Sequence, residues 1–386
     1  LKAVDDKTLE ITLNKPVATF TTIFSLWPTF PAREDLITAK GDAWTDPANI
    51  IVNGPFTLKS LTLKDNLVLV PNPEWGGQEP ALQEITVKFI DDLSAAFRQF
   101  QTDELDVTEI LATDVVTAEG DSALKDLVLI SPTARITAIE TQMKNPALAN
   151  FDLRLAISHA INREQLIDVV YDGVGEPATF WLVKGLPGHQ GNDKFESEIG
   201  YDVDKAKAAL KRYTDAGNNL PELRLTVRDT PARRNEVDFL AKALKDTLGL
   251  TVIPEFVDSP TRSARFNAQD FDLFPGGWQL DYPDPENPLV GLFDTGGGNN
   301  KYNCSDPEID AAFKKAADAT SEEARIAAYQ EVETLVVTKL CGVIPMYQDA
   351  KPYLVDSKLG GIVENGTIDA GLPGTYCVEC WFVKAE

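Results

Sequence analysis

The sequence predicts a mixed α/β protein with two domains, and three observations lead to this prediction. A chain of 386 residues is longer than a single core usually supports. The first 145 residues are rich in short alternating runs, which are typical of strands. Between residues 223 and 257, an alternating run, a helical run and another alternating run follow one another. This is the pattern of two parallel strands joined by a right-handed helical crossover.

The first part of the chain reads as strand-rich, with one clear helix. The helix is indicated at residues 92–102 by apolar residues three and four positions apart, among them Phe97 and Phe100. Asn53-Gly54-Pro55 indicates a turn. We expect strands at residues 8–13, 49–58, 66–71, 84–90 and 127–140.

From about residue 150 the pattern changes to helices that alternate with strands. Asp152 is expected to cap the first helix, and Asn162 with Gln165 is expected to restart it. Gly249 is expected to close the crossover helix. A further helix is indicated at residues 203–214, and further strands are indicated at residues 223–227, 250–257, 270–275, 343–348 and 352–355.

Two consecutive helices are indicated after residue 304. Ser305 with Glu308 forms one capping box, and Thr320 with Glu323 forms the other. If these two helices pack antiparallel, the start of the first lies beside the end of the second.

The four cysteines are predicted to form two disulfides. Cys304 precedes the first of these helices and Cys341 ends the second, so antiparallel packing would bring them together. Cys377 and Cys380 are too near the end of the sequence for a thioredoxin-type helix, and two histidines are too few to favour a zinc site. A local disulfide is the favoured interpretation, and two bridges indicate an extracellular or periplasmic location.

The composition excludes some classes of partner. The formal net charge is −24, which argues against binding to nucleic acid or to an anionic membrane surface. No stretch approaches the roughly 20 apolar residues that span a bilayer. The sequence opens at Leu1 with a strand pattern and no signal segment, so we expect a processed or truncated chain.

The most informative segment is residues 276–288, Gly-Gly-Trp-Gln-Leu-Asp-Tyr-Pro-Asp-Pro-Glu-Asn-Pro, which follows the predicted strand 270–275. We expect a loop that prolines stiffen. It presents one carboxylate between two aromatic faces, an arrangement that suits a ligand with a positive charge. The alternative interpretation is a proline-rich turn whose tryptophan fills a core. The candidate ligand-binding residues are Gly276, Gly277, Trp278, Gln279, Asp281 and Tyr282.

A further candidate lies in the loop 229–234, beyond the carboxyl end of a predicted strand, where ligands of open α/β sheets bind. Arg233 and Arg234 could face an anionic group there. Solvated surface arginines are the favoured alternative.

Six segments, taken in order, resemble the bacterial extracellular solute-binding proteins of family 5, the oligopeptide- and dipeptide-binding components of ABC importers. The segments are Val4–Leu13, Asn53–Leu58, Leu69–Trp75, Asp152–Glu164, Tyr201–Lys207 and Gly277–Pro285.

The resemblance implies a two-lobed fold of the periplasmic-binding-protein type II class, with an N-terminal portion missing from this chain. It implies a partial lobe I at residues 1–147, a lobe II at 148–348 and a return to lobe I at 349–386. Asp281 would hold the amino terminus of a peptide, and main-chain groups of Gly276–Gln279 would pair with its backbone.

The function implied is capture of peptides or similar solutes for an ABC transporter permease, without catalysis, cofactor or metal. The protein would be a monomer in the periplasm or outside the cell, lipid-anchored at full length. Two alternatives come from the same loop: a secreted hydrolase such as a glycosidase, with Asp281 paired to Asp284 or Glu286, and a calcium site on these three carboxylates. Neither a Gly-x-Ser-x-Gly nor a His-Glu-x-x-His motif is present.

Overall fold

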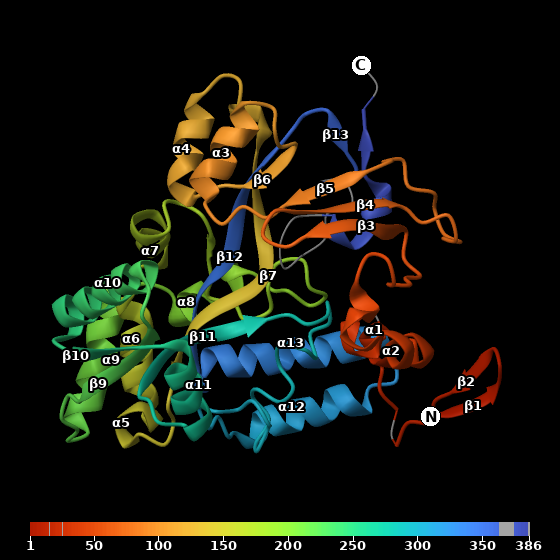
Figure 1. The fold of residues 1–386 in the computed structure, drawn as a ribbon. Coiled ribbons are helices and arrows are strands. Elements are labelled where there is room, and N and C mark those ends of the chain that lie inside the picture. The colour runs from red at the N-terminus through yellow and green to blue at the C-terminus, as the bar shows by residue number, and fades with distance from the viewer. Residues whose placement is uncertain (15, 25, 363–373, 385–386) are drawn as a thin grey trace.

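The computed structural model describes residues 1–14, 16–24, 26–362 and 374–384 (Figure 1). Its central feature is a seven-stranded sheet in the order β10–β9–β11–β7–β12–β6, with β8 beside β12. The neighbours β9, β10 and β11 are parallel, whereas β7 is antiparallel to both β11 and β12. The strands are β6 (Val107–Glu109), β7 (Val128–Thr141), β8 (Glu176–Pro177), β9 (Glu222–Arg228), β10 (Thr251–Val257), β11 (Leu273–Gln279) and β12 (Val343–Val355).

Most of this sheet is covered by helices that form the larger of two apolar cores. The crossover from β9 through α10 to β10 is parallel, as the sequence predicts, and Gly249 ends α10 in the left-handed conformation. Burial of apolar helix faces against the sheet supplies most of the stability of such a layer. The helices are α5 (Pro146–Ala149), α6 (Phe151–Ala160), α7 (Arg163–Val170), α8 (Glu196–Ile199), α9 (Val203–Asp215), α10 (Pro231–Leu248), α11 (Ser259–Ala268), α12 (Pro307–Asp318) and α13 (Glu322–Thr338).

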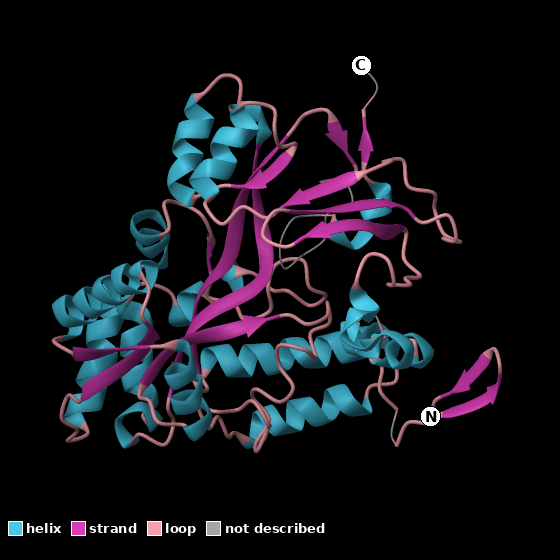
Figure 2. Ribbon diagram, viewed as in Figure 1, coloured by secondary structure: helices cyan, strands magenta, loops and turns pink. Residues whose placement is uncertain are grey.

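A smaller core lies at the other end of β7 and β12. It contains Phe97 and Phe100 of α3 (Leu93–Gln101), Val115 of α4 (Ala112–Gly120) and Leu354 of β12. The larger core contains Ile136 of the same long β7–β12 ladder. The two long strands therefore connect the two cores. In Figure 2 they run from the pair α3 and α4 to the larger group of helices. The division into lobes at residues 147 and 348 stays a prediction.

The remaining described elements are short. A separate three-stranded sheet is antiparallel, and the hairpin of β1 and β2 stands apart near the N-terminal end (Figure 1). These elements are β1 (Lys2–Asp5), β2 (Thr8–Glu10), α1 (Phe20–Ile23), α2 (Glu34–Lys40), β3 (Phe56–Thr62), β4 (Asn66–Pro71), β5 (Ile85–Lys88), β13 (Leu359–Gly360) and β14 (Phe382–Val383), with 3-10 turns at Trp27–Thr29, Gly41–Thr45, Lys125–Leu127, Asn192–Lys194 and Thr375–Cys380.

Two predicted strands in the first part of the chain were too long. The strand predicted at 8–13 is only Thr8–Glu10, and the strand predicted at 49–58 begins at Phe56. The turn before Phe56 prevents an earlier start, because the Gly54 carbonyl accepts a hydrogen bond from the Asn72 side chain at 2.8 Å. The Pro55 carbonyl accepts another from the Asn72 amide at 2.9 Å.

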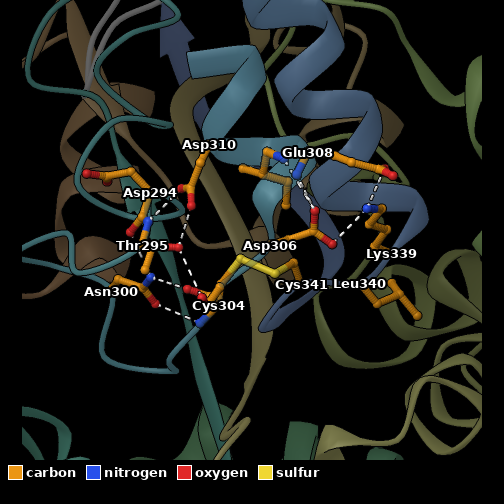
Figure 3. Close-up of a disulfide and its surroundings, with 12 residues drawn as sticks. Asp294, Thr295, Asn300, Cys304, Asp306, Glu308, Asp310, Lys339, Leu340 and Cys341 are labelled. Carbon is orange, nitrogen blue, oxygen red and sulfur yellow. Dashed lines mark hydrogen bonds and ion pairs between the residues drawn. A yellow bond between two sulfur atoms is a disulfide. The ribbon is translucent and has the colours of Figure 1, made fainter. Parts of the chain in front are cut away.

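The predicted helix caps are displaced. Asp306, not Ser305, caps α12, and its carboxylate accepts from the amide of Glu308 at 2.8 Å. Lys339, the residue directly after α13, lies 2.7 Å from the same carboxylate (Figure 3). A carboxylate that bonds both the helix end and a cation is a stronger acceptor than a hydroxyl.

Two other caps also differ from the prediction. Ser321 caps α13 in place of Thr320, and Asn150 caps α6 in place of Asp152. The cap of α7 is Asn162, whose side chain accepts from the Gln165 amide at 2.9 Å. That prediction is confirmed.

Both predicted disulfides are present. Cys304 and Cys341 join the start of α12 to the end of α13 (Figure 3), and both residues are buried. Cys377 and Cys380 form the local bridge.

Candidate functional site

The candidate segment begins inside a strand, not in a loop. β11 runs from Leu273 to Gln279 and pairs with β7 along its whole length. The prediction that residues 276–279 form a loop is therefore wrong. The two glycines are needed because of what lies against them. A Cβ at Gly276 would overlap the carboxylate of Glu140, and a Cβ at Gly277, whose φ is +118°, would overlap the carbonyl of Ile136.

Glu140 of β7 is a buried carboxyl directly beneath this strand. Its Oε1 accepts a hydrogen bond from the Gly277 amide at 3.0 Å, while its Oε2 has no hydrogen-bond partner among the described residues. Burial raises the pKa of Glu140 to about 7, against the opposing effects of the Gly277 amide, Arg262 and Arg135. The sequence offered no local sign of this group.

The loop after β11 is organised by Asn287. The indole nitrogen of Trp278 donates to the Asn287 side-chain oxygen at 2.8 Å, and the amide of Asp281 donates to the same oxygen at 3.0 Å. The Asn287 side chain in turn donates to the Asp281 carboxylate at 3.1 Å. Asp281 is exposed to solvent, and no ion pair with an arginine of the described residues occupies it. Its carboxylate is held in place but keeps capacity for a cation.

Trp278 combines features of both sequence interpretations. Its side chain is half-buried and packs against the larger core. Tyr282 is also half-buried, and burial raises the pKa of its phenol. The aromatic residues thus support the loop and expose only part of their faces around Asp281.

The other two carboxylates of the loop are already occupied. Arg325 of α13 donates to both oxygens of Asp284, at 2.9 and 2.6 Å, and both side chains are mostly buried. Glu286 accepts from the Thr19 hydroxyl at 2.8 Å. Asp284 is therefore poorly placed to act as an acid or base with Asp281. It is equally unsuited to complete a calcium site, and among the described residues no group of three or more acidic, histidine or cysteine side chains is arranged to hold a metal.

A second feature of the site is a cavity of about 220 Å³ beside β11. The sequence singled out one of its arginines, Arg233, but gave no sign that the others join it. Arg234 lies outside it, pairs with Asp229 at 2.7 Å and stacks over the Phe256 ring. The cavity is lined by Arg135, Val227, Arg228, Thr230, Arg233, Arg262 and Pro275, and by none of the exposed groups around Asp281.

The cavity exists because β9 and β11 diverge. Within the described residues their register holds a single pair, Leu273 with Leu225, so the edge of β11 from Phe274 onward turns away from β9. The opening lies at the carboxyl end of β9, one of the parallel strands, and ligands of open α/β sheets bind at such ends. No helix among the described residues combines the length and apolarity that crossing a bilayer requires.

Comparison with known proteins gives a consistent result. Residues 1–300 match the family model described as bacterial extracellular solute-binding proteins, family 5 middle. The chain is 28% identical to the periplasmic murein peptide-binding protein MppA of Escherichia coli, over 97% of this chain and 70% of that protein. It is 24% identical to the oligopeptide-binding protein OppA of Bacillus subtilis, again over 97% of this chain and 70% of the relative.

Solved structures have the same fold. The unliganded open form of MppA superimposes with a TM-score of 0.82 at 23% identity, covering 99% of this chain and 73% of that one. The putative peptide-binding protein AppA of Clostridium difficile gives a TM-score of 0.83 at 20% identity, covering 99% of this chain and 78% of that one. With a family model that spans most of its length, this chain belongs to the bacterial extracellular solute-binding proteins of family 5.

Proposed function

We propose that this protein captures short peptides or similar solutes outside the cytoplasm and delivers them, chemically unchanged, to the permease of an ABC importer. The observation that carries the proposal is the family match over residues 1–300, together with relatives named for oligopeptides and murein peptides. We also propose that the protein is a periplasmic or extracellular monomer with a lipid anchor. The two disulfides support an oxidising compartment.

Asp281 is the group we assign to the solute's ammonium. It is exposed, its backbone and side chain are fixed by Asn287, and no cation of the described residues pairs with it. A carboxylate that is held in position before binding loses little conformational entropy when it accepts a charged donor. Trp278 and Tyr282 would supply the apolar walls beside that charge.

The main chain of β11 is the part we assign to the solute's backbone. Its edge beyond Leu273 has no strand from β9 against it, so Gly276–Gln279 can accept an added strand. The predicted lobes, 1–147 with 349–386 and 148–348, would close over this strand. The β7–β12 ladder would form the connection between them.

Calorimetry with a matched pair of peptide pools tests the assignment of Asp281. Tripeptides with a free amino terminus should bind, and the same peptides with an acetylated amino terminus should bind at least tenfold more weakly. Asp281→Asn should weaken binding of the free peptides by about 1.5–3 kcal/mol, the range for a hydrogen bond to a charged group. It should leave the acetylated pool unaffected, and peptides recovered after incubation should be intact.

Two results would reject parts of the proposal. Equal affinity for free and acetylated peptides would remove Asp281 from the site. A Trp278→Ala variant that loses stability while its folded fraction binds normally would make Trp278 a core residue only.

A further inference from the structure

The arginine-lined cavity carries more positive charge than its own carboxylates neutralise. Arg233 pairs with buried Glu236, and Arg135 pairs with Asp349 at 3.2 Å. Arg228 and Arg262 form no ion pair with a carboxylate of the described residues. The chain as a whole has 36 basic and 60 acidic residues, so a cavity with two uncompensated guanidiniums runs against its overall charge.

Arg262 is held by neutral contacts. One of its NH2 groups donates to the Pro275 carbonyl at 2.6 Å, and its guanidinium lies 4.0 Å from the centroid of the Phe274 ring. Burial lowers the pKa of Arg262 to about 10. The three other arginines of the cavity also lower this pKa, and nearby Glu140 raises it. The guanidinium remains charged at neutral pH. Its repulsion from the neighbouring arginines would be relieved by an anion in the cavity.

The start of α10 adds to this positive environment. Thr230 caps the helix, its hydroxyl accepts from the Arg233 amide at 3.3 Å, and the residue lines the cavity. The 18-residue helix therefore begins at the cavity wall, and helix N-termini favour negative charge. The helix end and the arginines therefore both favour an anion in the cavity.

Size limits what the cavity can hold. At about 220 Å³ it is smaller than the roughly 300–1,000 Å³ that pockets for whole ligands occupy. It suits one end of a solute. Pro275 of β11 lies at its wall, and β9 does not pair with β11 beyond Leu273, so a chain added along Gly276–Gln279 could place a terminal group inside it.

We propose that the cavity binds a doubly negative end group, on carboxylate or phosphoryl oxygens, of a solute that lies along β11. Two guanidiniums without a counter-charge call for two negative charges, and their forked donors suit planar or tetrahedral oxyanions. This inference rests on the proposed function and narrows it, from peptides in general to solutes whose end opposite the ammonium is dianionic.

Three peptide pools of three to five residues test the proposal by calorimetry. One pool ends in Asp with a free carboxylate, one ends in Asn with a free carboxylate, and one ends in an amidated phosphoserine. We expect the Asp pool, the phosphoserine pool or both to bind about tenfold more tightly than the Asn pool. This factor corresponds to the lower end of the free-energy range for a hydrogen bond to a charged group. Which dianionic pool binds tells whether carboxylate or phosphoryl oxygens fit.

The variant Arg228→Gln makes the test specific, because this arginine is exposed and its replacement should not disturb folding. It should abolish most of the preference for the dianionic pools and leave the Asn pool within twofold. Arg98→Gln, the same change at an exposed position of α3, is the matched control and should alter neither. Equal affinity for the Asn pool and both dianionic pools would overturn the inference and leave the proposed function standing.

A second measurement separates the two proposals when no pool binds. Inorganic phosphate should raise the melting temperature of the wild type more than acetate does at matched ionic strength, and Arg228→Gln should remove that difference. Such a shift without any peptide binding would support the anion site and reject the peptide function. The absence of both would reject both.

Discussion

The ion pair between Asp284 and Arg325 ties the candidate binding loop to α13, and its removal is the sharpest test of how that loop is held. Two hydrogen bonds, at 2.9 and 2.6 Å, join the guanidinium to both carboxylate oxygens. Each side chain is only 13% exposed. Asp284→Asn would keep the shape of the side chain and remove its charge, which leaves Arg325 mostly buried with no full counter-charge in contact.

The expected loss follows from this burial. Breaking a buried ion pair by removing one partner destabilises proteins by about 3–5 kcal/mol. The residual exposure of Arg325 and the nearby negative charge of Glu286 reduce the loss, so we expect about 3 kcal/mol. Arg325→Gln should give a similar loss, and the double variant should lose less than the sum, with a coupling energy of roughly 2 kcal/mol.

Urea unfolding followed by circular dichroism measures these free energies. Asp318→Asn is the matched control, because Asp318 pairs with Lys314 at 2.5 Å on the exposed face of α12, where the side chains are 64% and 75% exposed. The control should lose no more than about 0.5 kcal/mol. If Asp284→Asn lost as little as the control and showed no coupling to Arg325, the pair would not be what holds the loop.

Three further predictions concern buried groups. Gly276→Ala should destabilise the fold by roughly 1–3 kcal/mol in urea unfolding, because its Cβ would overlap the Glu140 carboxylate. In the double variant with Glu140→Ala, the total loss should be smaller than the sum of the two separate losses. Losses that simply add would contradict the overlap. Burial raises the pKa of both Glu140 and Glu333 to about 7, so the folded state binds a proton at each carboxyl more tightly than the unfolded state does. The contribution of this proton binding to the unfolding free energy is complete below about pH 4.5. It is lost as the pH rises to 7. The unfolding free energy should therefore fall by up to roughly 3 kcal/mol per group over that range, with a smaller fall in Glu333→Gln, and a flat profile would contradict it. Replacing both Cys304 and Cys341 by alanine should lower the unfolding free energy by about 4 kcal/mol, and a reducing agent should then have little further effect; an unchanged stability would show that the bridge contributes nothing.

Local patterns in the sequence were enough to predict a helix or strand wherever the segment only had to pack against apolar neighbours. The strand predicted at 66–71 is β4, the strand predicted at 127–140 is β7, and the crossover ending at Gly249 is present. Alternation and the 3.6-residue period report which face of a segment is buried, and that requirement does not depend on the identity of the partner. The cysteine spacing around two helices likewise predicted the bridge from Cys304 to Cys341.

The predictions failed where a distant side chain decided the local structure. β11 continues through Gly276 and Gly277, and groups more than 130 residues earlier in the chain fill the space that side chains would need there: the Glu140 carboxylate at Gly276 and the Ile136 carbonyl at Gly277. Asp306 became the cap of α12 because Lys339, from the next helix, approaches it. Neither partner can be identified from the segment itself.

The sequence by itself determined many of the helices and strands, the disulfides, the family and the loop that carries Asp281. Only the tertiary structure decided that Arg135, Arg228, Arg233 and Arg262 line one cavity, and that two of them have no carboxylate of the described residues to neutralise them. Those arginines come from β7, β9, α10 and α11, and they meet because β9 and β11 diverge after one shared pair. Charge balance within a cavity depends on distances through space, and these are fixed only when the sheet has formed.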